Sequence, residues 1–126
     1  MLSVSRQIEA PAAALWSLLV DVSTWPEWGP SVADVELSTS TLGAGSRGRV
    51  RTAVGLWLPF EVTGFDPGSR WSWSVSGIPA TSHSVRATGT GRCRVSFGVP
   101  WWAPAYLPVC AVALRRLDAL ATIPSD

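Results

Sequence analysis

The sequence predicts an α+β fold in which one antiparallel sheet is covered by helices from the two ends of the chain. Between residues 32 and 99, apolar and polar residues alternate in short runs that Gly, Pro and Ser separate. Such alternation is typical of strands with one buried face. Helical periodicity occurs in residues 11–22 and again in residues 106–121. Because helices and strands are segregated along the chain, the pattern favours α+β over alternating α/β units.

The first expected element is a strand over residues 2–9, in which apolar and polar side chains alternate. Arg6 falls on the apolar side of this strand. Two interpretations stay open for it: the side chain extends into solvent at the sheet edge, or it pairs with an acid such as Asp21.

Two helical pieces are expected next. Pro11 suits a first helical turn, because its missing N–H would be unpaired there in any case. The helix after it presents an apolar stripe made of Leu15, Leu18, Leu19 and Val22. A second, very short helix is predicted over residues 25–28, and Trp16 and Trp25 are assigned to packing at the corner between the two pieces.

Six further strands follow, joined by tight turns. The sequence 66–69 (Asp-Pro-Gly-Ser) and the stretches 77–79 and 89–91 are predicted to turn the chain. Counting through these hairpins places Trp71, Trp73 and His83 on one face of the sheet. The predicted strands are residues 32–37, 47–54, 57–66, 71–76, 81–87 and 92–99.

A closing helix is expected to begin near Pro108, because a proline inside a helix would break it. The apolar stripe of this helix needs the sheet to cover it. It consists of Tyr106, Val109, Cys110, Ala113, Leu114, Leu117 and Ala121.

Two motifs near the start of the chain resemble the START and polyketide cyclase-dehydratase superfamily (SRPBCC), which includes the birch-pollen allergens. They are Ile8-x-Ala-Pro-x-x-x-Leu-Trp-x-Leu-Leu-x-Asp21 and Trp25-Pro-x-Trp-x-Pro30. Similar features recur at Leu42-Gly-x-Gly45, at Asp66-Pro67 before Trp71-x-Trp73, and at a His on the sixth strand.

The resemblance implies the helix-grip fold over residues 1–126 as a single domain. In that fold a curved antiparallel sheet of about seven strands wraps around a C-terminal helix, and two short helices follow the first strand. The chain departs from the family near its end, where the last helix is short and residues 100–104 (Pro-Trp-Trp-Ala-Pro) form a stiff aromatic lead-in. This departure implies a smaller cavity or an altered entrance.

Composition excludes several classes of function. The net charge of +1 argues against nucleic acid as a partner, and Arg47, Arg49 and Arg51 are expected to face water with Glu61 opposite one of them. No apolar run approaches the roughly 18 residues of a membrane span, and the first residues lack the pattern of a secretory signal. A cytoplasmic location is therefore expected.

The cysteines and acidic residues do not indicate a metal or cofactor. Cys93 and Cys110 lack metal-ligand or redox spacing and are interpreted as small buried hydrophobes. Acidic residues lie at turns, caps and outward strand positions, so no paired carboxylates are expected. The sequence therefore predicts no metal site and no cofactor.

His83 is the single histidine of the chain. On an apolar sheet face, such a residue is more often a hydrogen-bonded core or cavity residue than a general base. His83 and Tyr106 are nevertheless the catalytic candidates, because they are the inward groups that could move protons.

The chain has eight Trp residues among 126. This number indicates either a pocket with aromatic walls for a flat or apolar molecule, or a core that these side chains fill completely. The candidate ligand-binding residues are Trp28, Val50, Phe60, Val62, Trp71, Trp73, His83, Val85, Phe97, Trp101, Tyr106, Cys110 and Leu114.

Three functional hypotheses follow. The first is a carrier or sensor that binds a small hydrophobic molecule, lipid or polyketide-like, between the sheet and the last helix. The second, implied by the resemblance, is a polyketide cyclase or dehydratase that uses His83 and Tyr106. The third is a protein-interaction module with a filled core and a sticky patch at Trp101 and Trp102. A homodimer stays open.

Overall fold

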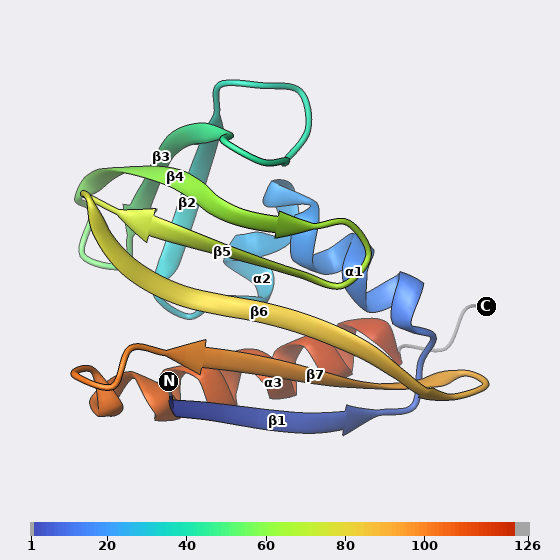
Figure 1. Ribbon diagram of the computed structural model, residues 1–126. Coiled ribbons are helices and arrows are strands. Elements are labelled where there is room, and N and C mark those ends of the chain that lie inside the picture. The colour runs from blue at the N-terminus through green and yellow to red at the C-terminus, as the bar shows by residue number, and fades with distance from the viewer. Residues whose placement is uncertain (1, 123–126) are drawn as a thin grey trace.

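The computed structural model describes residues 2–122, and it shows one seven-stranded antiparallel sheet (Figure 1). The strand order is β1-β7-β6-β5-β4-β3-β2, so the first strand lies beside the last. The strands are β1 (Leu2–Ile8), β2 (Val32–Leu37), β3 (Arg47–Thr52), β4 (Trp57–Asp66), β5 (Arg70–Val75), β6 (Ile78–Gly89) and β7 (Arg92–Val99).

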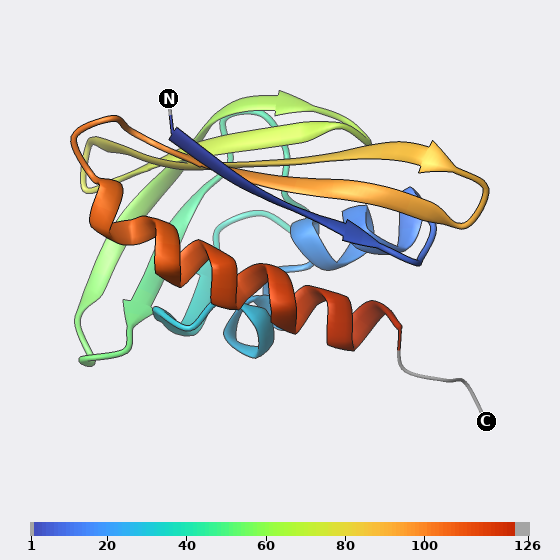
Figure 2. The same ribbon diagram turned by 90° about the horizontal axis from the view of Figure 1, so that it is seen from below.

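The helices lie together on one side of the curved sheet, as Figure 2 shows. The C-terminal helix α3 packs on β1 and β7, and α2 packs on α3 and β2. This arrangement confirms the helix-grip α+β fold. The helical elements are α1 (Ala12–Val20), the 3-10 turn η1 (Val22–Thr24), α2 (Trp25–Trp28), the 3-10 turn η2 (Pro104–Tyr106) and α3 (Leu107–Ala121).

Hydrogen bonds from two indoles fix the corner between α1 and α2. The Nε1 atom of Trp25 donates to the carbonyl of Leu19 at 3.0 Å, and Nε1 of Trp28 donates to the carbonyl of Leu18 at 3.2 Å. Both acceptors belong to the last turn of α1, where carbonyl groups lack helical partners. The corner therefore satisfies the end of one helix while it directs two tryptophans under the sheet.

The ion pair between β3 and β4 follows the predicted register. Arg47 lies opposite Glu61, and their side chains are 3.4 Å apart. Arg6 pairs with an acid, but its partner is Asp118 of α3 at 2.6 Å and not Asp21. Half-exposed pairs of this kind contribute at most about 1 kcal/mol.

The turn between β5 and β6 consists of residues 76 and 77, so it begins one residue and ends two residues before the predicted stretch 77–79. Ser76 and Gly77 both have positive φ, at 54° and 78°, which suits a two-residue hairpin. Ile78 is already in β6 and pairs with Val75. This correction places Ile78 beside the cavity described below.

Cys93 and Cys110 are buried and free, as expected of small hydrophobes. Within residues 2–122, no helix combines the length and apolar character that crossing a membrane would require.

Candidate functional site

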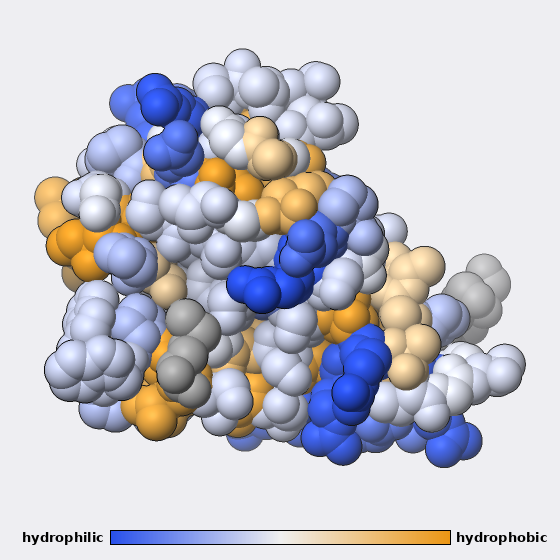
Figure 3. Space-filling model, in the orientation of Figure 1, coloured by the Kyte–Doolittle hydropathy of each residue, from blue (hydrophilic) through white to orange (hydrophobic). Residues whose placement is uncertain are grey.

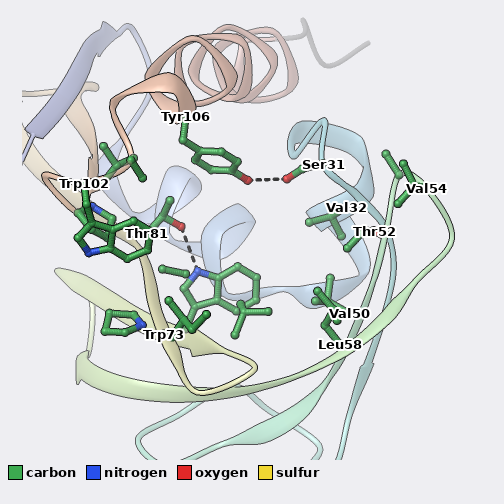
Figure 4. A pocket seen from close by; sticks show the side chains of 18 residues that line it. Ser31, Val32, Val50, Thr52, Val54, Leu58, Trp73, Thr81, Trp102 and Tyr106 are labelled. Carbon is green, nitrogen blue, oxygen red and sulfur yellow. Dashed lines mark hydrogen bonds between the residues drawn. The ribbon is translucent and has the colours of Figure 1, made fainter.

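A cavity of about 540 Å³ opens between the sheet and the segment that leads into α3. Its walls come from β3 to β7, from the loop before β2 and from residues 100–106. Val50, Leu58 and Val75 are among the residues of the sheet wall. Trp102 and Tyr106 face Val50 and Leu58 from the lead-in to α3 (Figure 4). Among the described residues that line this outer cavity, none carries a charge.

Side-chain to side-chain hydrogen bonds join two groups of residues that line the outer cavity. The hydroxyl groups of Tyr106 and Ser31 are 2.6 Å apart. On the other side, Nε1 of Trp73 donates to Oγ1 of Thr81 at 3.0 Å (Figure 4). Oγ1 of Thr81 also lies 2.9 Å from Nε2 of His83, so a chain of hydrogen bonds leads from the cavity wall to the buried imidazole.

A second, inner chamber of about 40 Å³ adjoins the outer cavity. The two spaces share Ser31, Val32, Trp73, Thr81 and Tyr106. Trp28, Trp71, His83, Phe97 and Cys110 are among the residues that wall the inner chamber.

His83 is neutral in this environment. Its side chain is buried, with the ring 4.0 Å from that of Trp71 and 4.8 Å from that of Phe97. Burial lowers the pKa of His83 to about 3 because it penalises the imidazolium, and a hydrogen bond with the backbone of Trp71 opposes part of this shift. Among the described residues, nothing hydrogen-bonds to Nε1 of Trp71.

Tyr106 and Cys110 are uncharged at neutral pH as well, because both keep their protons. Burial raises the pKa of Tyr106, although the hydrogen bond between Tyr106 and Ser31 partly opposes this. Burial likewise raises the pKa of Cys110 to about 11. The two chambers are therefore uncharged surfaces with a few hydroxyl and ring N–H groups.

Trp25 lines the inner chamber and is buried in the core. Its ring stacks on Trp71 at 5.1 Å with an interplanar angle of 8°, and it contacts Phe60 and Trp73 edge-on or tilted. Its role thus extends beyond packing at the helical corner, because it is the centre of the aromatic cluster that holds the chamber walls.

The sequence of this chain matches the family described as polyketide cyclase / dehydrase and lipid transport over residues 1–121. The protein belongs to this polyketide cyclase family. Among curated proteins, none matches the chain.

Solved structures agree with the polyketide cyclase family in fold. A protein from Bacillus thuringiensis is 14% identical with a TM-score of 0.73, over 97% of this chain and 98% of its own. XoxI from Bacillus cereus is 14% identical with a TM-score of 0.74, over 95% and 94%. DynU16, from the dynemicin biosynthetic locus, is 20% identical with a TM-score of 0.64, over 96% of this chain and 47% of its own.

The candidate residues of this polyketide cyclase family member separate into four groups. Val50, Trp73 and Tyr106 line the outer cavity. Trp28, Trp71, Trp73, His83, Phe97, Tyr106 and Cys110 line the inner chamber. Phe60, Val62, Val85 and Leu114 are buried in the core and line neither space. Trp101 is 77% exposed and lines neither space, whereas its neighbour Trp102 does line the outer cavity.

Sequence reasoning missed Ser31, Thr52 and Thr81, which supply hydroxyl groups to the outer cavity, and Ile78 at its edge. Thr81 could have been found, because it shares the alternating face of His83. Ser31 lies in a loop, where alternation gives no signal. Within residues 2–122, no three His, Cys, Asp or Glu side chains are grouped to hold a metal ion.

Proposed function

We propose that this member of the polyketide cyclase family binds a small hydrophobic molecule, lipid or polyketide-like, and acts as a carrier or sensor. The observation that carries this proposal is the outer cavity, with its volume of about 540 Å³ and its uncharged lining. Ligand pockets are typically roughly 300–1,000 Å³, mostly apolar, and furnished with a few polar groups. The outer cavity has these features.

Native mass spectrometry of the freshly purified protein tests the proposal, followed by denaturing extraction to identify any released compound. We expect a stoichiometric apolar adduct, or uptake of one from a panel of sterols, fatty alcohols and aromatic polyketides. The variant Val75→Trp should abolish uptake, because it places an indole into the outer cavity. The matched control Ser74→Trp adds the same side chain one position away, outside the cavity lining, and should bind normally. Absence of uptake by the wild-type protein across the panel would refute the proposal.

Proton-transfer catalysis has weaker support. A general base works best when its pKa lies near the operating pH, whereas His83 has a pKa of about 3. Tyr106 and Cys110 hold their protons at neutral pH. The cyclase or dehydratase hypothesis stays a prediction, and full turnover by His83→Ala of any compound that the protein converts would remove the proposed role of His83.

The exposed tryptophan supports a second candidate function, an interaction surface that joins two copies of the chain. Trp101 is 77% exposed and Leu56 is 61% exposed. In the view of Figure 3, hydrophobic residues reach the surface at the end of the molecule where the β5–β6 turn lies. Light scattering after size-exclusion chromatography should give a dimer that Trp101→Ser dissociates. A monomeric wild-type protein at high concentration would contradict this candidate.

A further inference from the structure

We propose that the ligand carries an uncharged hydrogen-bond acceptor, which binds to the paired hydroxyl groups of Ser31 and Tyr106 while the apolar body of the ligand fills the outer cavity. This inference rests on the proposed function, because it names the chemical class that the same site takes. The class is a neutral apolar molecule with an acceptor oxygen, such as a ketone.

The hydroxyl pair holds one hydrogen more than its own bond uses. The oxygen atoms of Ser31 and Tyr106 are 2.6 Å apart, so one hydroxyl donates to the other. Each hydroxyl carries one hydrogen, and the accepting hydroxyl therefore keeps its hydrogen to donate elsewhere. Within residues 2–122, neither hydroxyl has another hydrogen-bond partner. The pair thus offers one donor, whichever of the two oxygens accepts.

The hydroxyl pair is placed where a molecule in the outer cavity can reach it. Both residues line this cavity, and the hydrogen bond between them is exposed. Their side chains point toward each other from the loop before β2 and from the lead-in to α3 (Figure 4). Backbone hydrogen bonds hold both positions. The N–H of Ala53 donates to the carbonyl of Ser31 at 3.2 Å, and the N–H of Tyr106 donates to the carbonyl of Ala103 at 3.1 Å.

The other hydrogen-bonding side chains of the outer cavity are less suited to hold a ligand. The Thr81 hydroxyl already pairs with two ring nitrogens, one of which is Nε1 of Trp73. Thr52 ends β3 beside an exposed turn, and Trp102 is 54% exposed, so water can reach both. Tyr106 differs, because burial raises its pKa and its hydroxyl is therefore partly removed from water.

The lining favours a neutral acceptor over a charged one. Among the described residues around the outer cavity, none carries a charge. An ionised carboxylate would lose its hydration there without gaining a cation. A carbonyl oxygen costs far less to remove from water, and a single hydrogen bond offsets much of that cost. One spare hydroxyl hydrogen is therefore enough to orient a ketone.

Three adamantane probes test the inference: 2-adamantanone, 1-adamantanol and 2-methyleneadamantane. The first two carry an acceptor oxygen, whereas the third replaces the ketone oxygen with a methylene group of similar shape. Calorimetry measures their affinities for wild-type protein and for the double variant Ser31→Ala/Tyr106→Phe, which removes both hydroxyl groups. We expect the double variant to bind the ketone and the alcohol roughly tenfold more weakly and the hydrocarbon equally well.

Two further variants locate the donor. Thr63→Val removes a hydroxyl from the exposed face of β4, outside the cavity lining, and should bind 2-adamantanone like wild type. Thr52→Val removes another hydroxyl of the lining. A loss of ketone affinity in Thr52→Val, with none in the double variant, would assign the acceptor to Thr52 and overturn the inference.

The ketone gives a second readout that does not depend on affinity. A carbonyl that accepts a hydrogen bond absorbs infrared light at a lower frequency, so 2-adamantanone bound to wild type should absorb below the same ketone bound to the double variant. An equal frequency in the two proteins, or an equal loss of affinity for ketone and hydrocarbon, would overturn the inference and leave the proposed function intact. Failure of wild type to bind any of the three probes would contradict the proposed function and the inference with it.

Discussion

Thr81 is the residue that links the cavity wall to the buried imidazole. Its hydroxyl accepts the indole N–H of Trp73 and pairs with Nε2 of His83, and its own side chain is buried. Removal of this one oxygen would take away the partner of a buried imidazole nitrogen and of a half-buried indole N–H. The hydroxyl thus supports the fold and shapes the junction of the two chambers.

The variant Thr81→Val should therefore lower the free energy of unfolding by about 2 kcal/mol, because the valine fills the space and supplies no hydrogen bond. Urea denaturation monitored by tryptophan fluorescence measures the change. Thr63→Val on the exposed face of β4 is the matched control and should lie within about 0.5 kcal/mol of wild type. Equal stability of the two variants would show that the Thr81 hydroxyl does not stabilise the folded protein.

His83 should make the stability of the protein depend on pH. Its pKa is about 3 in the folded protein and about 6.5 when unfolded, so between these values the unfolded chain binds the additional proton. The contribution of His83 to the free energy of unfolding is therefore completely present above pH 6.5, and it is lost as the pH decreases toward 3. Between pH 7 and pH 5 we expect His83 to account for a loss of about 2 kcal/mol.

Urea titrations at pH 7, 6 and 5 measure this loss, and the same series with His83→Phe isolates it from the carboxylates. The variant should be nearly flat over this range. An equally steep decline in the variant would assign the pH dependence to other groups.

At the scale of elements, Gly48 sets how closely β2 and β4 approach β3. A Cβ atom at this position would clash with the backbone carbonyl of Glu36 and lie 3.0 Å from the ring of Phe60. Gly48→Ala should therefore cost about 2–3 kcal/mol of stability, by overpacking and by displacement of a strand. It should also weaken ligand uptake, because β3 carries Val50 on the cavity wall.

Gly55→Ala is the comparison, since nothing lies within 4 Å of its added Cβ and only its φ of 90° is strained. We expect about 1 kcal/mol for that change and no effect on uptake. Chemical denaturation orders the two variants, and a milder effect at Gly48 than at Gly55 would contradict the packing argument.

The order of elements was predictable because alternation and helical periodicity are strong in this chain. Each of the six later strands has one apolar face, and Pro108 lies in the first turn of α3, close to the expected start. The β5–β6 turn was misplaced because Pro79 suggests a turn, whereas the backbone turns at Ser76 and Gly77 through positive φ. A proline at that end of β6 is tolerated next to the hairpin.

At the scale of the whole molecule, the position of the cavity was less predictable than the fold. Facing residues come from strands far apart in the sequence, and the curvature of the sheet decides which inward side chains meet and which leave a space. Phe60 and Val62 point inward as expected but pack against other core residues, whereas Val50 borders open volume. Alternation gives the face of a side chain, and not its distance from the opposite wall.

An open apolar cavity also makes the stability of the whole molecule depend on its ligand. Walls that face empty or water-filled volume lose the dispersion contacts that a filled core would have, and an apolar guest restores them. A ligand that binds the folded chain alone stabilises it by about 2.7 kcal/mol at a concentration 100-fold above its Kd. We therefore expect the melting temperature of the wild-type protein to rise with the concentration of 1-adamantanol, measured by differential scanning fluorimetry or calorimetry. Val75→Trp should show no such rise, and Ser74→Trp should respond like wild type. A rise of equal size in Val75→Trp would place the bound molecule outside the outer cavity.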